Sequence, residues 1–180
     1  KADEDTVFEV GDLNIGQDTA TLKEIVDALE ETYCGSIGVE AAHIARTRQR
    51  KWIQHRLERI KSKPSFSAET KEHLLKRLIA AEGLEKYLAS KYPGTKRFGL
   101  EGGESFIPMI TEMIHICGEK QVKEIVIGMA HRGRLNLLVN VLGKRPDELF
   151  DEFEGKAKHQ GSSDVKYHQG FSSNMTTRSG

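Results

Sequence analysis

Residues 124–142 constrain the fold more than any other stretch of this chain. A short β-branched run, Glu124–Ile127, meets Gly128, a polar turn follows, and apolar residues return at helical spacing from Leu135. This change of period predicts a strand, a turn and a helix. Ligands of open α/β sheets bind where strands end and helices begin. We therefore expect a binding site in this turn.

The turn carries His131, Arg132 and Arg134 around Gly133. Arginine can hold a carboxylate with two parallel hydrogen bonds, and histidine titrates near neutral pH, so these side chains suit an anion that needs a proton donor. The same residues would also serve to shape the turn and cap a neighbouring helix. Spacing alone leaves both interpretations open.

A second polar stretch contains His168 and Ser172 in a loop bounded by glycines. Loops on a rigid scaffold often carry binding residues, although an ordinary surface loop has the same composition. The spacing of the two residues does not make a Ser-His-acid triad. The remaining histidines show no His-x-x-x-His metal spacing and are interpreted as structural; they are His43, His55, His73, His115 and His159.

The first half of the chain predicts a helical layer behind an acidic, extended lead-in over residues 1–18. Thr21 and Glu24 have the spacing of a capping box, which predicts a helix start. Further helices are expected over residues 40–61, from Ser67, and from about Gly83 to the break at Tyr92-Pro93-Gly94.

The character of the chain changes after Pro93, so we divide it into residues 1–95 and residues 96–180. The second part predicts a helix ending at Gly118, then the strand, turn and helix described above. It closes with a short acidic helix that has Pro146 in its first turn. This order predicts an α/β fold. One strand cannot form a sheet, and the chain begins with Lys1, so we expect a piece of a longer protein.

Composition excludes several classes of function. Lysine plus arginine and aspartate plus glutamate number 27 each, so no overall field favours nucleic acid or a membrane surface. The basic stretch from Arg46 to Lys63 is interpreted as a solvated helix face, with Trp52 on its apolar side. Two cysteines without a Cys-x-x-Cys pair favour a reducing, intracellular setting. There is no membrane-length apolar run, no signal-peptide core, and neither common phosphate-loop fingerprint.

Four motifs together resemble the E1 component of the 2-oxoglutarate dehydrogenase complex. They are RFGLEGGE at residues 97–104, GMAHRGRLN at 128–136, DVKYH at 164–168 and GFSS at 170–173. The segments ETYCGSIGVE and KWIQ, at residues 31–40 and 51–54, are also similar to that family. The resemblance covers almost the whole chain in the family's order. Met129-Ala130 before His131 favours the bacterial branch.

The resemblance implies an enzyme that depends on thiamine diphosphate and Mg²⁺. Such an enzyme decarboxylates 2-oxoglutarate and reductively succinylates the lipoyl group of E2, the dihydrolipoyl succinyltransferase, in the tricarboxylic acid cycle. E3, the dihydrolipoyl dehydrogenase, would be a further partner, and the full-length E1 a homodimer. The expected compartment is the bacterial cytoplasm, or the mitochondrial matrix in a eukaryote. The expected fold is α/β: a helical subdomain, then the first strand-helix units of a thiamine-diphosphate-binding parallel-sheet domain.

The resemblance also assigns residues. His131 and His168 are implied to be catalytic and, with Ser172, to bind the dicarboxylate and assist proton transfers, while Arg97 is implied to support the cofactor. The family's Gly-Asp-Gly…Asn-Asn motif is absent from these 180 residues, so no metal ligand is named and the piece alone is expected to be inactive. Two related activities stay open, a 2-oxoadipate dehydrogenase E1 and a non-oxidative 2-oxoglutarate decarboxylase. A non-catalytic helical interaction module is the alternative from another class.

Overall fold

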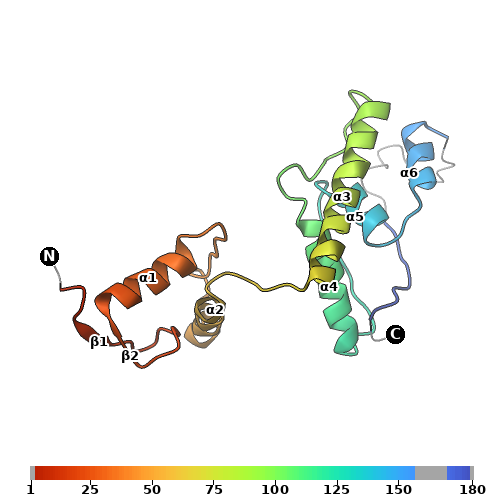
Figure 1. Ribbon diagram of the computed structural model, residues 1–180. Coiled ribbons are helices and arrows are strands. Elements are labelled where there is room, and N and C mark those ends of the chain that lie inside the picture. The colour runs from red at the N-terminus through yellow and green to blue at the C-terminus, as the bar shows by residue number, and fades with distance from the viewer. Residues whose placement is uncertain (1–2, 157–169, 179–180) are drawn as a thin grey trace. The chain divides into compact units, whose positions relative to one another are not determined.

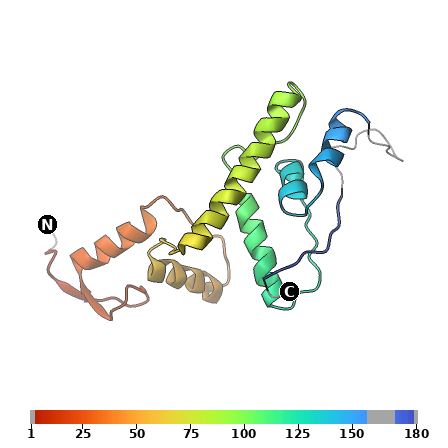
Figure 2. The same ribbon diagram turned by 45° about the vertical axis from the view of Figure 1, so that its right-hand side comes forward.

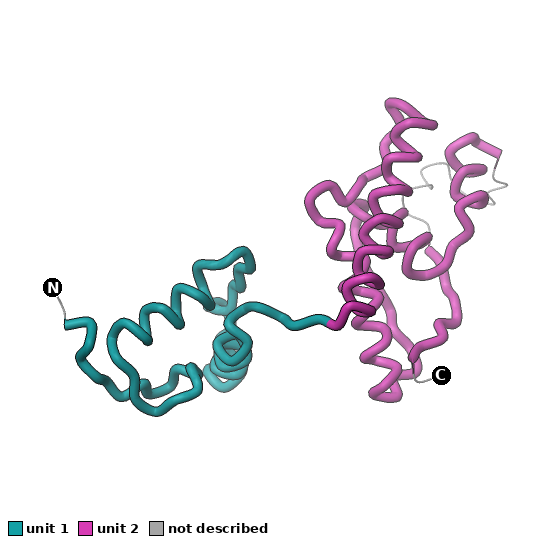
Figure 3. Tube along the Cα trace, viewed as in Figure 1, with its two compact units in different colours: residues 1–66 teal, residues 67–180 magenta. Residues whose placement is uncertain are grey.

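The computed structural model describes residues 3–156 and 170–178, which divide into two compact units, residues 1–66 and 67–180 (Figure 3). The described chain is mostly helical, with one small two-stranded antiparallel sheet (Figure 1). The predicted helical layer is therefore confirmed. The predicted division of the chain into residues 1–95 and 96–180 stays a prediction. Within the ranges given above, no helix is long and apolar enough to cross a bilayer.

The first unit begins with a β-hairpin and continues into two helices. Strands β1 (Val7–Glu9) and β2 (Thr19–Thr21) pair antiparallel, with Phe8 opposite Ala20. Helix α1 (Leu22–Tyr33) follows β2 directly, and α2 (Thr47–Ile60) packs against α1. The extended lead-in of the sequence analysis thus contains one strand of a hairpin whose second strand ends at the first helix.

The capping box at the start of α1 is confirmed. The Thr21 hydroxyl accepts a hydrogen bond from the Glu24 N–H at 3.2 Å, and the Glu24 carboxylate accepts one from the Thr21 N–H at 2.8 Å. Two donors at the helix start are satisfied in this way, and such a cap contributes about 1 kcal/mol. The transition from β2 to α1 is therefore encoded locally.

Helix α2 differs from its prediction in two respects. It begins at Thr47 rather than near Glu40, because Ala41–Ile44 forms a turn instead and the helix propensity of alanine is a weak determinant that tertiary contacts override. Trp52 was assigned to the buried side and is 65% exposed, so that assignment was wrong. The buried face of α2 instead contains Glu58, which is 6% exposed.

Glu58 holds the first unit together. Its Oε2 accepts a hydrogen bond from the Asn14 N–H at 2.7 Å, and its Oε1 accepts one from the Tyr33 hydroxyl at 2.8 Å. These bonds connect α2 to the hairpin loop and to the end of α1. Burial of the Tyr33 hydroxyl, together with the neighbouring Glu58 carboxylate, raises the pKa of Tyr33 to about 12.

The described residues of the second unit form four helices, which Figure 2 shows in a view turned by 45° from that of Figure 1. They are α3 (Ala68–Lys91), α4 (Phe106–Glu119), α5 (Arg134–Asn140) and α6 (Pro146–Phe153). Ser67 caps α3 by accepting the Thr70 N–H, and Pro146 occupies the first turn of α6, both as predicted. The prediction of a separate helix near Gly83 was wrong, since α3 runs through it. One glycine costs a helix only about 1 kcal/mol, which packing of α3 against α4 and α5 offsets.

Helix α5 contributes to both apolar clusters of the second unit. Leu137 joins a cluster with Ile107 of α4, and Leu135 joins one with Leu88 and Leu149. All five side chains are buried. Burial of apolar surface is the main favourable term in folding. These contacts therefore stabilise α5 although it is only seven residues long. The turn that precedes α5 is therefore attached to a well-packed helix.

The expected strand at Glu124–Ile127 does not form among the described residues. Val126 is 87% exposed and Ile125 is 38% exposed. A strand needs a hydrogen-bonding neighbour, and the part of the chain that the structure describes offers none beside this segment. The apolar pattern is real, but what it would pair with is not among these residues.

Candidate functional site

Two glycine-rich loops of the second unit meet in space. The Gly133 N–H donates to the Phe98 carbonyl at 2.8 Å, and the Arg132 Nη1 donates to the Gly99 carbonyl at 2.6 Å. These bonds join the motif at residues 97–104 to the motif at 128–136. We call the two segments the paired loops. Their contact makes one site out of two separate sequence signals.

His131 lies on the exposed side of the paired loops. Its ring stacks on the Phe98 ring with centroids 4.8 Å apart and an interplanar angle of 22°. Phe98 itself has φ of +47°, a left-handed conformation that is uncommon for an aromatic residue. Strained backbone of this kind persists where the surrounding structure holds it, and often at binding sites. The Phe98 face thus orients an accessible imidazole.

Gly133 is required by the packing of the paired loops. Its φ is +74°, and a Cβ at this position would stand 2.3 Å from the Leu100 Cδ2. Any side chain would therefore clash with Leu100 as well as strain the backbone. The glycine that the sequence analysis associated with a turn also permits close approach of the two loops.

The arginines of the turn bind backbone carbonyls. Arg134 Nη1 donates to the Met129 carbonyl at 2.7 Å, closing the turn around His131, while Arg132 holds Gly99 as described above. The interpretation that they shape the turn, which spacing left open, is therefore supported. The Arg132 side chain remains 70% exposed and lies 3.6 Å from the Glu101 carboxylate.

Arg97 pairs with Glu101, its Nη2 lying 2.7 Å from Oε1. Its Nε is buried and has no hydrogen-bond partner within the described ranges. A buried N–H without a partner is uncommon in native structures. Arg97 therefore retains a donor that a bound group could use.

Glu85 on α3 supports the paired loops from below, a role that the sequence analysis missed. It is 8% exposed, and its Oε1 accepts hydrogen bonds from the Leu100 N–H at 2.8 Å and from the Asn136 Nδ2 at 2.9 Å. The signal for it was a charged residue between Ala81 and Leu88 on the buried face of a helix, since residues three and four apart share a face.

The other two predicted site residues are His168 and Ser172. His168 lies outside the described residues. Ser172 is exposed, and its neighbour Ser173 donates to the Leu142 carbonyl at 2.7 Å, beyond the C-terminal end of α5. His131 precedes the N-terminal end of the same helix, which spans about 10 Å. The described residues thus place Ser172 and His131 at opposite ends of α5.

That the remaining histidines are structural stays a prediction; His43 is exposed, while His55 and His73 are half-buried. His115 on α4 is partly buried, and desolvation followed by the nearby Arg178 cation lowers its pKa. Across residues 3–156 and 170–178, no three His, Cys, Asp or Glu side chains gather in a way that could hold a metal ion.

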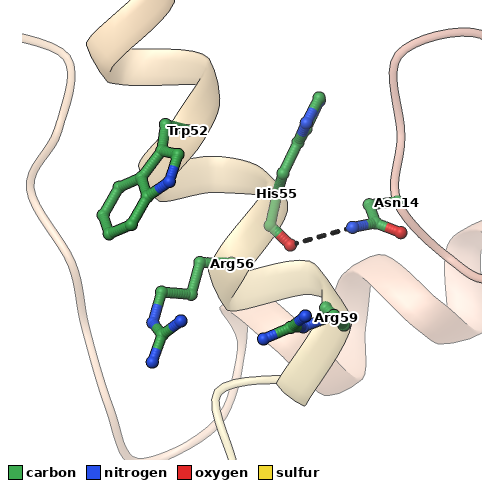
Figure 4. A pocket seen from close by; sticks show the side chains of 5 residues that line it. All are labelled: Asn14, Trp52, His55, Arg56 and Arg59. Atoms are coloured by element: carbon green, nitrogen blue, oxygen red, sulfur yellow. Dashed lines mark hydrogen bonds between the residues drawn. The ribbon is translucent and has the colours of Figure 1, made fainter.

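An open hollow of about 170 Å³ lies in the first unit, on α2 (Figure 4). It is lined by Asn14, Trp52, His55, Arg56 and Arg59. The Arg56 guanidinium lies over the Trp52 ring, 5.8 Å from its centroid, and Asn14 donates to the His55 carbonyl. Both arginines are exposed. The hollow agrees with the predicted solvated, basic face of this helix.

Comparison with known proteins finds relatives that are named 2-oxoglutarate dehydrogenase E1 component. No family model matches the chain. It is 62% identical over 180 residues to the 2-oxoglutarate dehydrogenase E1 component of Azotobacter vinelandii, which covers 99% of this chain. The proteins of the same name from Cupriavidus necator and Haemophilus influenzae are 54% and 49% identical, over 100% and 93% of the chain.

The chain spans only 18–19% of the length of these relatives, in their amino-terminal part. The resemblance seen in the sequence is confirmed: this chain matches the amino-terminal fifth of the 2-oxoglutarate dehydrogenase E1 component. The paired loops and α3 to α6 all lie within the matched residues.

Proposed function

We propose that this chain is the amino-terminal part of an enzyme that decarboxylates 2-oxoglutarate and transfers the succinyl group reductively to the lipoyl group of E2. The observation that carries this proposal is the 62% identity across 99% of the chain, which includes both paired loops. Complex membership with E2 and E3, a homodimeric full-length enzyme and a bacterial cytoplasmic setting belong to the same proposal. The relatives cited are all bacterial.

Within this enzyme, His131 binds substrate. Its imidazole is exposed and oriented by Phe98, so it can donate a hydrogen bond to a carboxylate or keto oxygen of a 2-oxo dicarboxylate and supply a proton nearby. His168 and Ser172 supply further donors. Because Ser172 lies at the far end of α5, the complete protein has to shape a substrate site that reaches both ends of this helix.

Thiamine diphosphate supplies the electron sink for decarboxylation when it is bound. The unpartnered Nε of Arg97 fits a contact with this anionic cofactor, because a guanidinium N–H binds phosphate or carboxylate oxygens well. No residue described here is assigned to Mg²⁺. The exposed Ile125 and Val126 fit a parallel strand that pairs with chain outside these residues, which would complete the proposed parallel-sheet α/β domain from residue 96.

The test is His131→Ala in the full-length enzyme. We expect kcat/KM for 2-oxoglutarate to fall about 10²-fold or more, the typical contribution of a positioned acid-base group, with unchanged thiamine diphosphate affinity by calorimetry. His43→Ala is the matched control, since His43 is exposed in the first unit. Unchanged turnover of His131→Ala, or an equal loss in the control, would contradict the substrate role.

Three further measurements separate the alternatives. A higher kcat/KM for 2-oxoadipate than for 2-oxoglutarate would favour the longer substrate. Release of succinic semialdehyde without lipoyl-dependent NADH formation would favour a non-oxidative decarboxylase. Full-length protein that neither turns over substrate nor binds thiamine diphosphate would favour an interaction module.

A further inference from the structure

We propose that Glu85 is a positioning residue that holds His131 in its working orientation from beneath the paired loops. This inference rests on the proposed function only in taking His131 as a substrate-binding group. Glu85 is only 8% exposed, and its described hydrogen bonds come from Leu100 and Asn136. It acts through a short series of hydrogen bonds and packing contacts.

The first step is that one carboxylate oxygen of Glu85 accepts two hydrogen bonds. Glu85 Oε1 accepts from the Leu100 N–H on one loop and from the Asn136 side chain in the first turn of α5. Glu85, Leu100 and Asn136 are all buried, being 8%, 6% and 2% exposed. Buried polar groups that lose their partner carry a full desolvation penalty, so this arrangement is strongly preferred over any in which the loops shift.

The second step leads from these donors to the imidazole. Leu100 packs against Gly133, whose N–H donates to the Phe98 carbonyl, and the Phe98 ring stacks on His131. Asn136 fixes the other side, because it lies in the first turn of α5, three residues after Gly133. Glu85 therefore determines the position of both loops on which the imidazole depends.

The third step concerns the second oxygen of the carboxylate. A Cβ at Gly99 would stand 2.6 Å from Glu85 Oε2 and 2.6 Å from Glu101 Oε2, so both carboxylates lie against this glycine. The Gly99 carbonyl binds Arg132. The two donors from Leu100 and Asn136 need only the other oxygen, Oε1. An amide at position 85 can therefore keep both acceptor contacts, whereas a methyl group cannot.

The experiment compares Glu85→Ala with Glu85→Gln in the full-length enzyme. We expect Glu85→Ala to lower kcat/KM for 2-oxoglutarate about 10²-fold, the loss that a 1 Å misplacement can cause, with thiamine diphosphate affinity unchanged. Glu85→Gln should recover most of the loss, because its carbonyl oxygen can accept from both donors. Hydrogen exchange should accelerate in residues 97–104 and 128–136 of Glu85→Ala and stay near wild type in Glu85→Gln.

Ile114→Ala is the matched stability control. Ile114 is a buried core residue of α4 in the apolar cluster that also contains Leu100, and its side chain has no hydrogen-bonding group, so its loss changes packing alone. This variant should lower the melting temperature at least as much as Glu85→Ala while kcat/KM stays near wild type. An equal loss of kcat/KM in both variants, or native kcat/KM in folded Glu85→Ala, would overturn the positioning role.

If Glu85→Ala does not fold, Asn136→Ala replaces it, since it removes the contact on the α5 side. The same loss of kcat/KM is expected there, and native kcat/KM would overturn the proposal. If the wild-type enzyme does not act on 2-oxoglutarate, the proposed function fails. Exchange rates then decide about Glu85: faster exchange of the paired loops than in Ile114→Ala supports its role, and equal exchange refutes it.

Discussion

Each unit of the molecule is organised around one buried glutamate, but the two are used differently. In the first unit, one carboxylate oxygen of Glu58 accepts a hydrogen bond from the Asn14 N–H and the other accepts one from the Tyr33 hydroxyl. Glu85 in the second unit receives both of its donors, from Leu100 and Asn136, on the same oxygen. The first arrangement ties helices to a hairpin loop. The second ties a helix to two loops that carry an exposed histidine.

The difference shows why the loss of two similar buried carboxylates should affect the protein differently. The groups around Glu58 lie in the hairpin loop and at the end of α1, so its loss should loosen a structural junction. The groups around Glu85 include segments with left-handed backbone at Phe98 and Gly133, which need outside support. We therefore expect Glu58 to matter for stability and Glu85 to matter for the geometry of the site.

The strongest way to break the second arrangement is Gly133→Ala. The new Cβ would meet Leu100 at 2.3 Å in a backbone with φ of +74°. We expect a loss of about 2–4 kcal/mol in the free energy of unfolding, from backbone strain plus overpacking, measured by denaturant titration. Gly128→Ala is the control in the same turn, because nothing lies within 4 Å of its Cβ position. Equal stability of the two variants would show that the loops do not approach as described.

Glu58→Ala should break the first arrangement with a smaller effect. It leaves the Asn14 N–H and the Tyr33 hydroxyl without their acceptor, which costs about 1–3 kcal/mol. Hydrogen exchange should accelerate in α1 and α2, while exchange of the paired loops stays as in wild type. Tyr33→Phe, which removes one donor and leaves Asn14 paired, should have the lesser effect. Faster exchange of residues 97–104 in Glu58→Ala would contradict the separation of the two roles.

The smallest expected effect is a change in the pKa of Tyr33, which tests the electrostatic influence of Glu58. Burial is the main cause of the raised pKa of Tyr33, about 12 against an ordinary 10.0, and Glu58 is the second. Glu58→Gln should lower this pKa while leaving it above 10.0, as followed by tyrosinate absorbance. Because the unfolded chain ionises first, the Tyr33 contribution to stability is present below pH 10 and is lost as pH rises from about 10 to 12. An unchanged pKa in Glu58→Gln would mean that burial alone sets it.

Local signals were predicted well from the sequence. The capping box at Thr21, the cap at Ser67 and the proline at 146 each depend on neighbours within a few residues, and each is confirmed. The interruption expected at Gly83 was wrong because tertiary packing outweighs one unfavourable residue. Trp52 was misassigned because a stripe of period 3.6 does not say which of its edges meets a partner.

The candidate site shows the same limit. Its two motifs and His131 were identified from sequence, and glycines correctly indicated unusual backbone. The contacts that join the motifs could not be predicted, because Glu85 is 15 residues from Leu100 and 51 from Asn136 and no local pattern links them. The contribution of Val126 to a sheet stays a prediction, because pairing depends on residues beyond those described.

The hydrogen bonds around Asn136 also bear on chemical ageing of the protein. Asn140 Nδ2 donates to Asn136 Oδ1 at 2.7 Å, and Asn136 Nδ2 donates onward to Glu85 and to the Ala81 carbonyl. Each asparagine in this series donates through its nitrogen, and Asn136 also accepts through its oxygen. Turning either side-chain amide by 180° would therefore break these hydrogen bonds. Deamidation at Asn136 would replace a donor by a carboxylate oxygen facing Glu85, and asparagine is among the thermolabile residues. Confinement of Asn136 within α5 therefore protects a single nitrogen atom on which the alignment of three segments depends.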